Sequence, residues 1–536
     1  MKRKALFLGA AFLCGALCAT AAEKAPFRVI FSNDTTNLLS CPSPFRPDRH
    51  KPITDDDIRA SVIETAGQGI DVHMLQPGLG WVPWWPSQFL PMARYVAWKK
   101  ARGEKPDAYE NYVLNGGDMV RVFIDQCRAS GETPFLSIRM NDVHHIYRGR
   151  GVQGDAAAQE KAMEEFPLFA DHPEYRIGPE MKGSMRYAFD WSHPEVREYK
   201  YRLLEELCRN YDFEGLELDF MRAPYLFNPV RSSLAQRRQI VTEFVGRVRR
   251  LLDETAKPGA HRWLCVRVPG YPQSYDEIGV DLPALAEAGA DMINASGYYF
   301  TDMQMDLPAI RKALPDSVAL YSEVHFATAI AAKPPTGDAL NRHASREELE
   351  TAAHLAYVQG ADGISVFNFQ YYRGTYGKTD VGGEGAEPPY SVFKVLRDPA
   401  ALARLPQDYF WGCRYFSPDR KPEPFHTLFH SGEVKEQSLI LAPPEGGWQQ
   451  DGRLRIQAKA SLGKTLWRAT LNGVSLEPDA DVSAPHAEYP VAIGKPEDYR
   501  AWKVPLSAVK EGVNRLRLGF SGEGEADLEY LQLWLP

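Results

Sequence analysis

Apolar residues in the first three quarters of the chain gather in short runs that have the length and composition of β-strands. Clusters of turn-forming residues bound these runs, as expected for strands inside a folded domain. The eight candidate strands are residues 28–32, 70–75, 135–139, 215–220, 263–268, 291–295, 318–322 and 363–367.

Between the candidate strands, apolar residues recur at the spacing of amphipathic helices, most clearly in residues 55–64, 118–129, 195–209, 236–254, 282–288 and 346–358. Eight strands that alternate with helices over about 370 residues predict an α/β chain folded as a (β/α)8 TIM barrel, whose site lies at the carboxyl ends of the strands. A doubly wound open sheet is the alternative. No Gly-x-Gly-x-x-Gly fingerprint follows the first strand, which disfavours that alternative.

The pattern changes near residue 405, where short alternating strands separated by Gly, Pro and Asp turns replace the helices. This change predicts a C-terminal β-sandwich. The expected strands are residues 439–441, 454–458, 465–471, 499–504, 514–519 and 528–535. We therefore expect a signal peptide at residues 1–22, a barrel at 23–404 and a sandwich at 405–536. The sandwich is either a carbohydrate-binding domain or a structural one.

The N-terminus has the layout of a secretory signal peptide. Three basic residues, Lys2, Arg3 and Lys4, precede an apolar run at residues 5–18 and a small-residue site at 19–22. The apolar run is shorter than the ~20 residues of a membrane-spanning helix, so we predict export to the periplasm or the medium, without membrane insertion of the mature chain.

The length of the chain limits the number of domains, and its charge limits the classes of partner. A chain of 536 residues exceeds what a single hydrophobic core usually supports. Its net charge is −8 and it contains no block of Lys and Arg, which argues against nucleic acid. The five cysteines beyond the signal are scattered and indicate neither a disulfide framework nor a zinc site. We predict no metal and no other cofactor, and the sequence carries no signal for the oligomeric state.

The fourth candidate strand holds two acids. Glu217 and Asp219 share one face of this strand, and Arg222 follows it. Carboxylates that face into a barrel are either paired in the interior or used at a site. Both interpretations remain open on this motif.

The other strand ends carry a mixture of aromatic, amide and charged residues that suits a sugar. They include Asp34 after strand one, Arg139 and His144 after strand three, Tyr299 after strand six and Asn368 after strand eight. Trp81, Trp84 and Trp85 form either a platform for a sugar ring or an apolar plug. Two long stretches, residues 77–115 after strand two and residues 141–192 after strand three, have the length of functional loops.

Two arginines stand at the ends of neighbouring strands. The guanidinium groups of Arg139 and Arg222 have the shape to grip a carboxylate, as in an anionic sugar. The alternative is that each arginine pairs with a nearby acid, such as Asp142 or Asp219. Five possible metal ligands could converge, namely His73, His144, His145, Asp34 and Asp142, but their spacing matches no metal motif.

Two segments carry a family resemblance. Residues 190–197 (DWSHPEVR) and 211–224 (YDFEGLELDFMRAP) resemble the glycosyl hydrolase-like barrel proteins. A narrower resemblance is to the barrel sialidases of glycoside hydrolase family 156, whose site residues follow the strands in a set order. Asp34, Arg139, His144, Arg222 and Asn368 match that order here.

The resemblance implies a secreted, inverting exo-sialidase that releases terminal sialic acid from glycoconjugates. Asp34, hydrogen-bonded to His144, would activate water. The substrate-binding residues would be Arg139, Arg222, Asn368, Asp219 and Tyr299, whereas the leaving-group acid is not identified. Two alternatives remain: a neutral-sugar glycosidase that uses an acid pair, Asp219 with Glu323 or Asp142, and a non-catalytic glycan-binding protein.

Overall fold

Eight parallel strands form a closed barrel, which confirms the predicted fold class and excludes the open sheet. The computed structural model describes residues 24–48, 50–150, 152, 156–298, 300–332, 339–374, 385–412, 428–486 and 495–536. The barrel strands are β1 (Val29–Asn33), β2 (Val72–Leu75), β3 (Thr133–Arg139), β4 (Gly215–Asp219), β5 (Trp263–Pro269), β6 (Met292–Ser296), β7 (Ala319–His325) and β10 (Gly363–Phe367). Every predicted barrel strand is therefore present.

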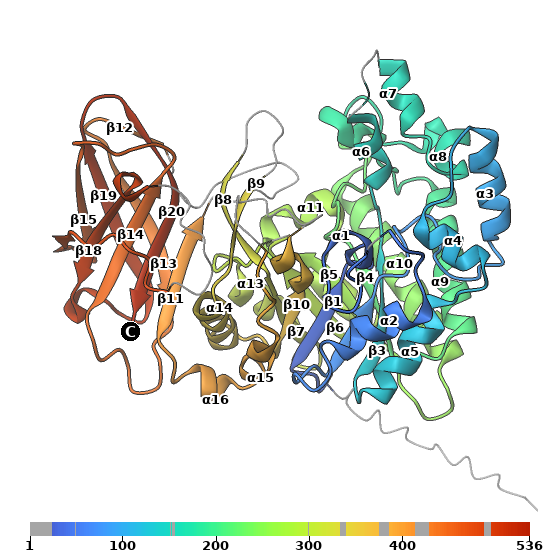
Figure 1. Cartoon of the computed structure of the whole chain (residues 1–536), viewed down its shortest axis with the longest axis horizontal. Helices are drawn as coiled ribbons and strands as arrows, with labels where there is room; N and C mark the ends of the chain where they lie inside the picture. Colours follow the sequence, from blue (N-terminus) through green and yellow to red (C-terminus); the bar gives the residue numbers. More distant parts are fainter. Residues whose placement is uncertain are drawn as a thin grey trace, which may run out of the picture.

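Helices surround the barrel (Figure 1). The helices are α1 (Asn37–Ser40), α2 (Asp55–Ile63), α3 (Met92–Ala101), α4 (Ala108–Leu114), α5 (Met119–Ala129), α6 (His144–Arg150), α7 (Ala156–Ala162), α8 (Pro167–Asp171), α9 (Pro194–Asn210), α10 (Leu234–Thr255), α11 (Tyr275–Ile278), α12 (Leu282–Glu287), α13 (Leu307–Ala313), α14 (Arg346–Val358), α15 (Phe393–Leu396) and α16 (Pro399–Leu402). All six predicted helices are confirmed. Capping boxes at Thr54, Ser233 and Ser345 satisfy backbone amides where α2, α10 and α14 begin.

The interior of the barrel has an apolar lower part and a polar upper part. The apolar part consists of side chains from the strands, among them Ile30, Val72, Met74, Phe135, Cys265, Met292, Ala319 and Tyr321. Above it lie buried polar side chains from five strands: Ser137, Glu217, Asp219, Arg267, Asn294 and Glu323. Leu216 and Leu218 belong to the core outside the barrel wall, so the predicted alternation along β4 is confirmed.

The long stretches after β2 and β3 fold into helices that close over the tryptophan cluster. Trp81, Trp84 and Trp85 are only 1–4% exposed. The Trp81 indole donates to the Asp142 carbonyl over 2.9 Å, and Trp84 stacks on Tyr109 with ring centroids 4.1 Å apart. The cluster is therefore an apolar plug, and the interpretation as a sugar platform is wrong.

Two antiparallel sheets follow the barrel and confirm the predicted sandwich (Figure 1). The first contains β11 (Gln407–Gly412), β20 (Glu525–Leu535), β14 (Gly452–Ala458), β18 (Tyr499–Val504), β17 (Glu477–Asp479) and β12 (Leu428–His430). The second contains β13 (Val434–Leu441), β19 (Gly512–Ser521), β15 (Leu466–Leu471) and β16 (Val474–Ser475). The sequence did not predict β11, the short strands β12, β16 and β17, or the separate hairpin of β8 (Ala327–Ala332) and β9 (Ala339–His343).

The sandwich is joined to the barrel through α14. The backbone amide of Asp408, in β11, donates to the Thr351 hydroxyl over 2.8 Å. Tyr530, in β20, bonds to Glu348, which is also paired with Arg342. Buried polar contacts therefore hold the sandwich against α14 of the barrel domain at this point.

The predicted signal peptide and Cys413 lie outside the described residues. Of the helices within the described ranges, none combines the length and apolar character needed to cross a bilayer.

Candidate functional site

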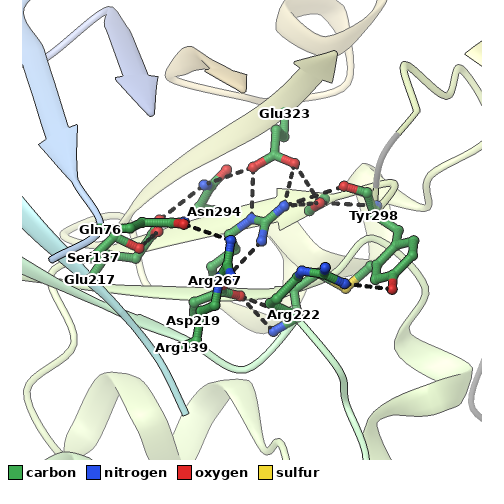
Figure 2. Close-up of polar contacts among 12 residues, drawn as sticks. Gln76, Ser137, Arg139, Glu217, Asp219, Arg222, Arg267, Asn294, Tyr298 and Glu323 are labelled. Atoms are coloured by element: carbon green, nitrogen blue, oxygen red, sulfur yellow. Dashed lines mark hydrogen bonds and ion pairs between the residues drawn. The ribbon is translucent and has the colours of Figure 1, made fainter. Parts of the chain in front are cut away.

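Arg267 is the centre of the polar network inside the upper barrel (Figure 2). Its guanidinium group donates to Asp219 over 3.0 Å and to both oxygens of Glu323 over 2.7 Å. These three groups are 0–2% exposed. One arginine thus neutralises two buried carboxylates on two different strands, as buried charges require.

Asp219 fixes the turn that carries Arg222. Its Oδ1 atom accepts hydrogen bonds from the backbone amides of Met221 and Arg222, over 2.9 and 2.8 Å. Its other oxygen is the one that binds Arg267. Both oxygens of Asp219 are engaged and its side chain has no exposed surface. Asp219 therefore fixes the position of Arg222 from inside the barrel.

Glu217, the other acid of β4, lies deeper in the barrel. It accepts hydrogen bonds from the Ser137 hydroxyl over 2.7 Å and from the Asn294 amide over 3.1 Å. Burial raises the pKa of Glu217 to about 7. Glu217 is therefore an interior residue, and the two acids of β4 do not form a pair open to solvent.

The residues that the sequence placed at the strand ends form what we call the mouth, defined as Asp34, Arg139, Asp142, His144, Arg222 and Asn368. Asn368 has a left-handed backbone with φ 58° and donates to Asp34 Oδ2 over 3.0 Å. Asp34 in turn is paired with Arg139. The structure therefore brings together five residues predicted from strands one, three, four and eight.

Arg139 is held from three sides. Besides Asp34, it binds Asp142 over 3.1 Å and the Gln76 side chain over 2.8 Å, and it is 2% exposed. Its pairing with Asp142 is the local alternative considered from the sequence. Both Asp34 and Asp142 therefore fix the direction of this guanidinium group.

His144 bonds to Asp142 and not, as expected, to Asp34. Its Nδ1 atom lies 2.8 and 2.9 Å from the two Asp142 oxygens, and its backbone amide donates to the same carboxylate. Asp34 is directed instead toward Arg139 and Asn368. The reason is local, because Asp142 lies in the same turn as His144.

The electrostatics of this pair keep the acid ionised and the imidazole neutral. Burial alone would raise the pKa of Asp142, but His144 and Arg139 hold that pKa well below its usual range. Burial lowers the pKa of His144 below its usual value, although Asp142 opposes the shift. The imidazole side chain remains 30% exposed, so it can meet a ligand.

Arg222 connects the imidazole to Tyr298. One guanidinium nitrogen donates to the Tyr298 hydroxyl over 2.8 Å, and another lies 3.5 Å from His144 Nε2. An arginine can only donate, so this approach favours the tautomer that carries its proton on Nδ1.

Tyr298 has a strained backbone that the polar network holds in place. Its φ is 74°, which is unusual for an aromatic residue. Its amide donates to Ser296 Oγ over 3.0 Å, and its carbonyl accepts from Arg267 over 3.3 Å. Strain of this kind gathers at functional sites. The predicted contact residue, Tyr299, lies outside the described residues.

A buried lysine supports the mouth from behind. Lys200 donates to the Arg139 carbonyl over 2.9 Å and lies 3.7 Å from the centroid of the Trp81 ring. Burial lowers the pKa of Lys200 to about 7. The sequence analysis missed this residue, although a lysine in the apolar stripe of a predicted helix was an available signal.

No family model and no curated protein sequence matches this chain. Among solved structures, α-L-fucosidase isoenzyme 2 from Paenibacillus thiaminolyticus is 13% identical, with a TM-score of 0.40 over 70% of this chain and 49% of that one. The maltogenic α-amylase AmyB from Thermotoga neapolitana is 12% identical, with a TM-score of 0.38 over 95% and 99%. A putative α-L-fucosidase from Bacteroides thetaiotaomicron is 13% identical, with a TM-score of 0.33 over 94% of each chain.

The chain spans about half the length of the first of these structures.

Proposed function

We propose that this protein is a glycoside hydrolase, and specifically an exo-sialidase that releases terminal sialic acid from glycoconjugates. The observation that carries the proposal is the position of the Asp142–His144 pair between two arginines, Arg139 and Arg222, at the carboxyl end of the barrel. A base beside two cations suits a substrate that carries a carboxylate next to the bond to be broken.

The two arginines have different parts in this proposal. Arg222 is 6% exposed and contacts Tyr298 and the partly exposed imidazole of His144, so we assign it to bind the carboxylate of the sugar directly. Arg139 is almost fully buried and is held by two aspartates. It supplies positive potential beneath the sugar, where the carboxylate must stay oriented as charge develops on the ring.

His144 is the proposed general base. With Nδ1 bonded to Asp142, its neutral Nε2 can take a proton from a water molecule as that water attacks the anomeric carbon. The glycosidic carbon–oxygen bond breaks, and the leaving oxygen takes a proton from an acid or from solvent. Asp34, first expected to activate the water, is assigned to positioning Arg139 and Asn368, because its contacts lead there.

The neutral-sugar alternative has less support. Its acid pair of Asp219 and Glu323 is bridged by Arg267, and both acids are buried. Asp142, the other candidate partner, is committed to His144 and Arg139. The guanidinium group of Arg267 occupies the space between Asp219 and Glu323 that a water molecule and a sugar would need between an acid and a base.

The test is the release of free sialic acid from sialyllactose and from a sialylated glycoprotein, compared with the His144→Ala variant. We expect release by the wild-type protein and none above background by the variant. A protein that retains intact sialylated glycans on an array without releasing sugar would instead be a binding protein. Hydrolysis of neutral glycosides alone would overturn the sialidase proposal.

We also propose that the chain is exported, because a basic start, an apolar run and a small-residue site occupy its first 22 residues. N-terminal sequencing of the protein recovered from periplasm or medium tests this, and a mature chain that still begins at Met1 would contradict it.

A further inference from the structure

Three side chains that can bind a metal lie together on the outer side of the barrel wall. They are His73 from β2, Cys127 from α5 and Glu132, which immediately precedes β3. One ligand atom of each lies within 4.8 Å of the others. All three are buried, with at most 5% exposure. The group is separate from the mouth, since His73 points away from the lumen that Val72 and Met74 fill.

The backbone holds this group in place. The amide of Glu132 donates to the carbonyl of Cys127 over 2.9 Å, which fixes the end of α5 against the start of β3. The imidazole of His73 packs edge-on against Phe31 and Phe123, with centroids 5.0 and 5.2 Å away. These contacts hold the side chains of His73, Cys127 and Glu132 close together without a bound ion.

One contact within the group is satisfied and another is not. His73 Nδ1 lies 2.8 Å from Glu132 Oε2. The second carboxylate oxygen, Oε1, is buried, and no hydrogen-bond partner for it is found among the described residues. An acceptor left without a partner in an apolar layer is costly, so the hydrogen bond to His73 alone does not account for the group.

We propose that His73, Cys127 and Glu132 form a structural zinc site. Sulfur, imidazole nitrogen and carboxylate oxygen are the atoms that zinc prefers, at about 2.3, 2.0 and 2.1 Å. A thiolate and a carboxylate balance the charge of Zn²⁺, which suits an apolar surrounding. Glu132 Oε1 or a water molecule takes the fourth position. Harder ions such as Mg²⁺ prefer an all-oxygen site.

The site would fasten α5 to two neighbouring strands of the barrel. Its ligands come from β2, from the last turn of α5 and from the connection into β3, so a single ion would link three elements that are neighbours in space. Metal that binds the folded chain stabilises it by the binding free energy. This inference runs against the sequence-based expectation of no metal, and it does not rest on the proposed activity.

The experiment uses purified, tag-free protein that is stripped with a chelator, reloaded and dialysed. We expect one zinc per chain by elemental analysis and a higher melting temperature than the stripped form. Reloading with Co²⁺ should give the near-ultraviolet absorption of a thiolate bound to cobalt. A protein that retains no zinc, or a cobalt form without this absorption, overturns the proposal.

Variants assign the ligands. Cys127→Ser should remove the cobalt–thiolate absorption and weaken zinc binding at least tenfold, whereas Cys208→Ser, at another buried free cysteine, should change neither. Glu132→Gln keeps the shape of the side chain and should also weaken zinc at least tenfold. If Cys127→Ser fails to fold by circular dichroism, the Glu132→Gln titration and the wild-type cobalt spectrum still decide. Equal effects of Cys127→Ser and Cys208→Ser would refute the site.

Discussion

Nδ1 of His144 lies 2.8 Å from Oδ2 of Asp142, in a turn that also directs the backbone amide of His144 to the same carboxylate. The aspartate thereby sets both the orientation of the ring and the nitrogen that carries the proton. Nε2 is left to face Arg222 and the opening of the barrel. The proposed role of His144 as a general base depends on this pair.

Replacing Asp142 with Asn should therefore abolish most of the activity. An asparagine keeps the size of the side chain but neither fixes the tautomer nor supports a positive charge on His144. We expect kcat on a sialoside to fall at least about 100-fold, within the range of general-base contributions. Steady-state kinetics measure this effect, with Asp171→Asn, at an exposed acid on α8, as the matched control. Unchanged kcat in Asp142→Asn would remove His144 from the role of base.

Arg222→Lys tests the carboxylate clamp. Lysine keeps the charge but loses the planar fork, so a bidentate grip on the sugar carboxylate is lost. We expect kcat/KM for a sialoside to fall about 10- to 100-fold, mainly through KM, because each charge-assisted hydrogen bond contributes about 1.5–3 kcal/mol. Arg209→Lys, on the surface of α9, is the control. Kinetics identical to wild type would show that Arg222 does not meet the substrate.

Tyr298→Phe removes one hydroxyl from the rim. The phenylalanine ring can keep the strained backbone, which Ser296 and Arg267 hold, but Arg222 loses its 2.8 Å partner. We expect about a fivefold loss in kcat/KM with a melting temperature within a few degrees of the wild type, as one lost hydrogen bond contributes about 1 kcal/mol. A large fall in melting temperature with normal kinetics would assign Tyr298 to stability alone.

Glu217→Gln tests the acid inside the barrel through its pH dependence. Burial raises the pKa of Glu217 to about 7 from its usual value of 4.5, so the folded protein favours the protonated form. The contribution of protonated Glu217 to the free energy of unfolding is fully present below pH 4.5. It is lost as the pH rises through 7, by at most about 3 kcal/mol. Glutamine cannot ionise, so the Glu217→Gln variant does not lose this stability as the pH rises.

The melting temperature of Glu217→Gln relative to wild type should therefore rise between pH 4.5 and pH 8. Thermal unfolding scans across this range measure the difference, with Glu214→Gln, at a more exposed acid beside β4, as the control. Parallel curves for Glu217→Gln and wild type would mean that Glu217 does not titrate in this interval.

The sequence was sufficient for the barrel because its strands are buried on both sides and appear as apolar runs. It also named five of the six residues of the mouth, since the carboxyl ends of parallel strands must meet. It named Asp142 as a partner of Arg139, but it did not name the partner of His144 correctly. Asp142 was also considered as a metal ligand and as one acid of a catalytic pair, but not as the partner of His144, although its place two residues before His144 allowed the hydrogen bond that forms.

Arg267 shows why register matters. Its opposite neighbour on β4 is Asp219, and Glu323 reaches it from β7. Neither relationship can be read from spacing along the chain, because it depends on how the strands are staggered in the closed barrel. The role of Trp81, Trp84 and Trp85 was ambiguous for a similar reason. Whether a ring is buried depends on how helices that are distant in the sequence pack against it.

The pairing of β11 with β20 has a consequence for how the chain reaches its native state. β11 is the first strand of the sandwich after the barrel and carries the buried rings of Tyr409 and Trp411, but its partner strand begins only at Glu525. Such a distant contact forms late, because a long loop must close first. Until then an apolar strand edge is open to other chains, so aggregation during refolding should depend on protein concentration and on how quickly the C-terminal strand arrives.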